Sequence, residues 1–169
     1  MANINGAFGL RPIAKVGSNA NSMGVSGYSS YEIASDNSNA IYHGTPVIPL
    51  STGYIDIVGA AAGGTVGLVG AFMGCKYVSS TTGKPTWSNY WPGSGADSNP
   101  PVEAFVADDP LQLFVIATDA SWTSKATARA AVFANANFAS GTSGSTTTGM
   151  SSATLGVSTI NTTANLNLR

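Results

Sequence analysis

The chain has 169 residues, of which 43% are hydrophobic and only 9% charged, with a formal net charge of −1. This length suffices for one domain with a core, and a near-neutral chain without a basic cluster argues against a nucleic-acid partner. So few charges favour a protein that works packed against neighbours, with a neutral secreted surface as the alternative.

Compartment signals are few. The single cysteine excludes an intrachain disulfide. The first residues have neither the basic nor the apolar region of a secretory leader, so we expect no signal peptide. The longest weakly polar run, residues 55–77, is interrupted by glycines and contains Asp56 and Lys76. We therefore expect no membrane span.

Residues 1–16 are predicted to form an extended arm ahead of a single β-rich domain over residues 17–169. Pro12 pushes Arg11 toward extended geometry. The apolar residues Phe8, Leu10 and Ile13 have no helical period. We expect the arm to contact a sister subunit or another protein, with packing on its own sheet as the alternative. The arm residues predicted at this interface are Phe8, Leu10, Arg11, Pro12 and Ile13.

Strands are predicted where apolar residues alternate between Gly, Pro and Asn turns. The predicted ranges are 28–33, 41–50, 54–58, 65–73, 102–107 and 111–118. Pro46 and Pro49 restrict their strand to a sheet edge or a bulge. The glycines near residue 70 also predict bulges. Residues 111–116 are the most hydrophobic stretch, and we expect them to be central.

An aromatic hairpin is predicted in the middle of the chain, with strands at 74–79 and 85–91 around a Ser/Thr/Gly turn. Strand spacing places Trp87 and Trp91 on one face and Tyr90 on the other. We expect these three rings in the core or at a subunit interface, because aromatic side chains bury the most area. The alternative is an exposed platform on which sugars stack.

The remainder of the chain is expected to contain the only helix. Residues 119–129 have helical spacing, with Thr123 or Ser124 as the N-cap. A strand over 130–138, a loop over 140–149 and short strands at 154–157 and 164–169 are predicted to follow. The expected fold class is therefore all-β, a β-sandwich or β-barrel with at most one short helix.

Candidate catalytic groups are sparse. His43 and Cys75 are the only residues of their kinds, and a mid-strand cysteine is better explained as a small buried hydrophobe. Asp108 and Asp109 precede a proline, so a turn with a capping Asp explains them better than an acid–base pair. We therefore expect no enzyme, no cofactor and no metal site.

Short motifs, spread in order over nearly the whole chain, resemble the head decoration (cement) proteins of tailed double-stranded DNA bacteriophages. These motifs are Ala7-Phe8-Gly9-Leu10-Arg11-Pro12, Gly74-Cys75-Lys76-Tyr77, Gly83-Lys84-Pro85, Tyr90-Trp91-Pro92 and Thr146-Thr147-Thr148-Gly149.

The resemblance implies a virion structural protein, made in the host cytoplasm, that binds the outer surface of the capsid and stabilises it. It also implies the major capsid protein as partner and a homo-oligomer, with a trimer favoured. A receptor- or glycan-binding virion surface module is the alternative.

Overall fold

The computed structural model describes residues 6–17, 27–59, 67–162 and 168. The chain is mainly β, with antiparallel sheets packed in a sandwich-like way, one short helix and no closed barrel among the described residues. The predicted all-β class is confirmed, and the sandwich form is favoured over the barrel.

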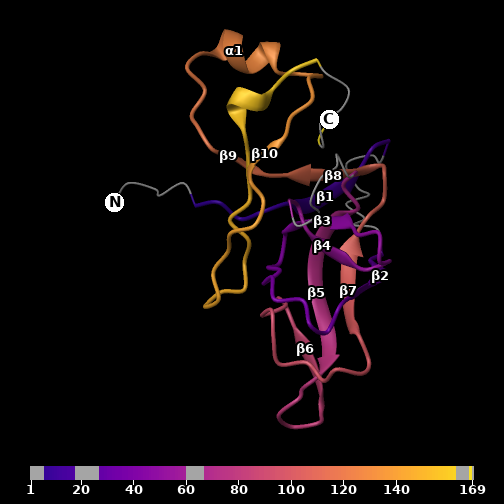
Figure 1. The fold of residues 1–169 in the computed structure, drawn as a ribbon. Coiled ribbons are helices and arrows are strands. Elements are labelled where there is room, and N and C mark those ends of the chain that lie inside the picture. Colours follow the sequence, from indigo (N-terminus) through magenta and orange to yellow (C-terminus); the bar gives the residue numbers. More distant parts are fainter. Residues whose placement is uncertain (1–5, 18–26, 60–66, 163–167, 169) are drawn as a thin grey trace.

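The largest sheet has six strands in the order β2-β7-β5-β3-β4, with β6 also paired to β5. Figure 1 shows β5 and β7 as the long vertical pair in this sheet. All pairings within it are antiparallel. Its strands are β2 (Ser29–Ile33), β3 (Pro46–Pro49), β4 (Ile55–Ile57), β5 (Gly70–Val78), β6 (Pro85–Ser88) and β7 (Val102–Ala107).

Strand β5 unites two stretches that the sequence analysis predicted separately, 65–73 and 74–79. The pairing register with β7 shifts between Phe72 and Gly74, and Gly74 has φ 139°. This confirms the predicted glycine bulge, because only glycine adopts such a backbone readily. Residues 65 and 66 lie outside the described part of the chain. The predicted hairpin is confirmed, with β6 returning antiparallel to β5.

Strand β3 corrects the edge prediction. It lies between β5 and β4 in the sheet, although Pro46 and Pro49 cannot donate ladder hydrogen bonds. The two prolines are its first and last residues. A missing N–H costs little at a strand end, so a short internal strand tolerates both.

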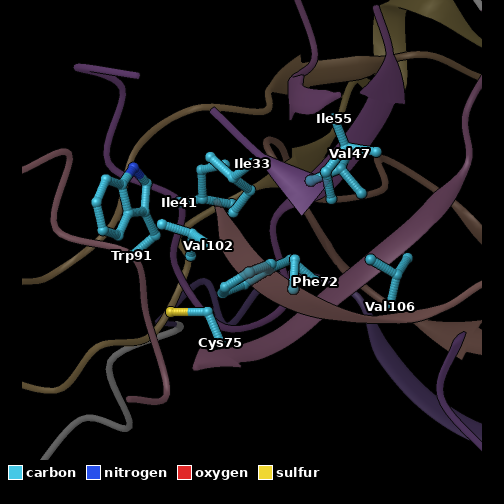
Figure 2. Close-up of a cluster of buried hydrophobic side chains, with 10 residues drawn as sticks. Ile33, Ile41, Val47, Ile55, Phe72, Cys75, Trp91, Val102 and Val106 are labelled. Atoms are coloured by element: carbon cyan, nitrogen blue, oxygen red, sulfur yellow. The ribbon is translucent and has the colours of Figure 1, made fainter. Parts of the chain in front are cut away.

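The core lies against the six-stranded sheet (Figure 2). Trp91 and Phe72 are its largest fully buried side chains, and the Tyr77 ring meets Trp91 edge-on at 5.4 Å between centroids. The Trp91 indole N–H donates to the Asn37 carbonyl at 3.2 Å, which satisfies its polar atom. The cluster consists of Ile33, Ile41, Val47, Ile55, Phe72, Cys75, Trp91, Val102, Ala104 and Val106.

Two small sheets complete the fold. Strands β1 (Arg11–Lys15) and β8 (Gln112–Val115) form one of them. The other contains β9 (Ala117–Thr118), β10 (Phe138–Ser140) and β11 (Thr154–Leu155). A 3-10 turn, η1 (Val157–Thr159), follows β11.

The helix α1 (Lys125–Ala130) falls at the end of the predicted range. Ser124 is its N-cap and accepts a hydrogen bond from the Thr127 N–H, as one of the two predicted caps. The predicted strand at 130–138 is wrong, because the chain leaves the helix in turns and β10 begins only at Phe138. Of the predicted strand at 164–169, only Leu168 lies within the described residues, where it bridges Ala136.

Candidate interaction surface

The predicted arm is built into its own chain. Arg11–Lys15 is extended, as expected, but it pairs antiparallel with β8. The Lys15 Nζ lies 2.7 Å from an Asp109 carboxylate oxygen, and the Gln112 side-chain amide donates to the Ala14 carbonyl at 2.8 Å. These residues therefore follow the alternative prediction of packing on the own sheet. Contact of the arm with another chain stays a prediction.

Two arm residues predicted at an interface are buried within the chain. Leu10 is only 2% exposed, its N–H donates to the Gly44 carbonyl at 2.8 Å, and Pro12 is buried on the inner side of β1. Neither side chain offers area to a partner, which corrects that prediction. Arg11 stays exposed, with its guanidinium carbon 5.4 Å from the centroid of the half-buried Phe8 ring.

The outer side of the β1–β8 pair is apolar and open to solvent. The side chains there are between 40% and 57% exposed. We call this surface the β1–β8 face. Its members are Ile13, Val16, Leu111, Leu113 and Val115. In Figure 1 the pair crosses between the large sheet and the C-terminal segments, with the N-terminal chain leading into β1.

The exposure of β8 overturns its predicted central position. Leu111, Leu113 and Val115 face solvent, whereas Gln112 is buried. The strand has one neighbour, β1, and its hydrophobic residues lie on both faces. Sequence reasoning therefore missed Val16, Leu111, Leu113 and Val115 as accessible apolar positions. Composition indicated burial, and no local signal tells an apolar face covered by its own chain from one left open.

The three aromatic residues of the hairpin region do not form one surface. Trp91 is 0% exposed and belongs to the core, so it cannot contact a partner. Trp87 is 67% exposed on β6. The prediction that they share a face is wrong, because β6 ends at Ser88 and the chain bends before Trp91. Tyr90 is half-buried, and its ring stacks on Tyr42 at 5.7 Å.

Trp87 forms an exposed aromatic site on the large sheet. Its ring stacks on Phe105 with centroids 5.7 Å apart and planes inclined by 7°. The Lys76 Nζ lies 5.1 Å from the Trp87 centroid and 4.0 Å from a Glu103 carboxylate oxygen. Ser30 donates to the same carboxylate at 2.9 Å. The site therefore combines an apolar ring with both signs of charge.

The candidate catalytic residues Cys75 and His43 both have structural partners. Cys75 is buried, which raises the pKa of its thiol to about 12, and its Sγ donates to the Tyr90 carbonyl at 3.6 Å. The His43 Nδ1 lies 3.0 Å from the Met73 carbonyl, and no hydrogen bond of the described residues joins His43 to Cys75.

The two neighbouring aspartates also have separate partners. Asp108 accepts hydrogen bonds from Ser29 and Tyr31, and the bond from Tyr31 is the main cause that raises the pKa of that phenol. Asp109 accepts from the Leu111 N–H at 2.8 Å, which is the predicted turn. In the described part of the chain, no group of three or more His, Cys, Asp or Glu side chains is placed to hold a metal ion.

Comparison of the chain with protein-family models, curated proteins and solved structures finds no match. Among the described residues, no helix has the length and apolar character needed to cross a bilayer.

Proposed function

We propose that this protein is a virion structural protein that binds the outer surface of a tailed-phage capsid and stabilises it. Its partner is the major capsid protein, and it acts as a homo-oligomer, with a trimer favoured. The resemblance of the chain to head decoration proteins supports this proposal. The observation that carries it is the β1–β8 face, an apolar surface formed by two strands that pair within the chain.

The chemistry of this face suits a protein partner. Its side chains are aliphatic, and the nearby Lys15 and Asp109 already pair with each other. Covering such a surface removes apolar area from water, and the exposed Arg11, opposite Val115 in the strand pairing, needs a carboxylate or carbonyl of the partner to replace its water. The low overall charge, 9% of residues, keeps the cost of desolvating charges small elsewhere.

The strength of one contact is modest, and repetition makes it sufficient. Covering the remaining exposed parts of these aliphatic side chains contributes about 3–6 kcal/mol per copy, before association costs of similar size. A shell presents the same site many times, and an oligomer engages several at once. Linked contacts then raise the overall affinity by orders of magnitude over one contact.

The proposal is tested by binding to shells of the phage whose genome encodes the chain. The variant Leu111→Ser/Val115→Ser removes two exposed members of the face and should decorate shells at least about tenfold more weakly in co-sedimentation. Tyr28→Ser, which removes an exposed ring outside the face, is the matched control. Shells depleted of the protein should also release DNA at lower temperature. Equal release temperatures with and without it would contradict the reinforcing function.

A second function, binding of glycans at the virion surface, is favoured by Trp87. An exposed ring beside Lys76, Glu103 and Ser30 offers an apolar platform with hydrogen-bonding groups around it. Binding of host polysaccharide that is lost in Trp87→Ala would support it. A Trp87→Ala protein that decorates shells normally would separate this function from capsid binding.

A further inference from the structure

A large apolar cavity lies between β8 and the C-terminal segments. Its volume is about 580 Å³, within the range of sites that accept a bound group. In Figure 1, β8 and β9 lie below α1. The lining includes Leu10, Phe114, Trp122, Leu155 and Ile160.

Gln112, one of the lining residues, carries a buried polar atom without a partner. Gln112 is 8% exposed, and its Nε2 donates to the carbonyls of Ala14 at 2.8 Å and Leu113 at 3.0 Å. Two acceptors around the nitrogen settle the orientation of the amide, which leaves Oε1 as the free atom. Among the described residues, no donor reaches this buried Oε1. A buried acceptor without a donor is costly, so an occupant that brings an N–H or O–H group to Gln112 would be favoured.

A matching group is displayed on the same part of the molecule. Phe133, in the turn after α1, is 93% exposed and has φ 67°. It is the one non-glycine residue with positive φ in the described part of the chain, and such a backbone is unfavourable for a bulky side chain. None of the hydrogen bonds of the described residues uses the Phe133 N–H. The turn thus presents an apolar ring and an unused donor together.

We propose that the cavity of one copy receives the Phe133 turn (residues 131–134) of a second copy. The ring would fill apolar volume, and a backbone N–H of the inserted turn would supply the donor that Gln112 Oε1 lacks. The segment from Ala130 to Ala134 carries no charge, so the inserted turn itself brings no ionised group into the cavity, whose lining includes Asp108 and Asp109.

The position of the turn explains how copies could engage each other. Ala131 and Ala134, which flank the two exposed residues of the turn, line the cavity of their own chain. The turn and the cavity therefore adjoin, and a rotation axis beside them brings each turn to the cavity of a neighbour. This inference deepens the proposed function, on whose oligomer it rests. Self-association is measured in solution without shells. A failure of this inference is therefore distinguishable from a failure of shell binding.

The first test is the oligomeric state of the full chain, measured by sedimentation velocity over a concentration series. The wild type should associate, and Phe133→Gly should weaken association at least about tenfold. Glycine accepts φ 67° without strain, so this variant should stay folded. Trp87→Ser, which removes another exposed aromatic ring, should associate like the wild type. A wild type that stays monomeric at millimolar concentration, or an equally associated Phe133→Gly, would overturn the proposal.

The second test addresses the cavity. Ile160→Trp fills it from its own chain and should also weaken association, with folding checked by circular dichroism and Leu155→Trp as a second filling variant. An equimolar mixture of Ile160→Trp and Phe133→Gly should associate more than either alone, because it still combines one intact turn with one open cavity. Failure of the mixture to recover association would refute the reciprocal contact. Trp122, which lines the cavity, should shift its emission to the blue on association in a Trp87→Phe background.

Discussion

Replacing Leu10 by alanine should destabilise the whole fold, although the residue belongs to the N-terminal segment. Leu10 is 2% exposed and its N–H donates to the Gly44 carbonyl at 2.8 Å. A buried Leu→Ala substitution costs about 2–5 kcal/mol. Leu10 also lines the cavity, so it has fewer packing neighbours on that side and loses fewer dispersion contacts. We therefore expect a decrease of about 2–3 kcal/mol in the free energy of unfolding, at the lower end of the range.

Ile13→Ala is the matched control, because it lies three residues away and removes a side chain that is 40% exposed. Its cost should stay below about 1 kcal/mol. Urea denaturation followed by circular dichroism measures the free energy of unfolding of both variants. An unchanged slope of this free energy against urea concentration indicates that the folded and unfolded states are the same. The reasoning fails if the two substitutions cost the same, since the segment would then lie on the fold without being part of its core.

Two further predictions concern the large sheet. Gly70→Ala should destabilise the protein by more than about 2 kcal/mol, because a Cβ there would collide with the Ala107 carbonyl of β7. Gly67→Ala meets no atom of the described residues and should be neutral in thermal melts. The Cys75 thiol should resist alkylation at neutral pH until the chain unfolds. Since burial raises its pKa from 9.0 to about 12, the folded state holds this proton more tightly, so the contribution to stability is complete below pH 9 and declines toward pH 12. Cys75→Ala should reduce the loss of stability between pH 9 and pH 12, measured as unfolding curves at alkaline pH. The same loss in Cys75→Ala and the wild type would contradict this assignment to the thiol.

Local sequence patterns predict the local elements of this fold. Alternation at 28–33, 54–58 and 102–107 predicts strands that the structure contains as β2, β4 and β7, because a period of two residues gives a strand one buried face. The turn chemistry before Pro85 predicts the hairpin, and the hydroxyl of Ser124 predicts the start of α1. Each of these signals acts between residues that are near one another in the chain.

Tertiary structure alone decided which apolar faces are covered. The arm pairs with a strand far along the chain, and the Gln112–Ala14 hydrogen bond joins residues separated by 98 positions. Residues 111–116 are hydrophobic enough for a central strand, yet β8 has a single neighbour and leaves Leu113 and Val115 in solvent.

Trp87 and Trp91 belong to one predicted strand, yet Trp87 is exposed and Trp91 lies in the core. Periodicity assigns residues to two faces, but the partner that covers a face is chosen by contacts between distant segments. Whether that partner lies in the same chain depends on packing, which no local pattern encodes.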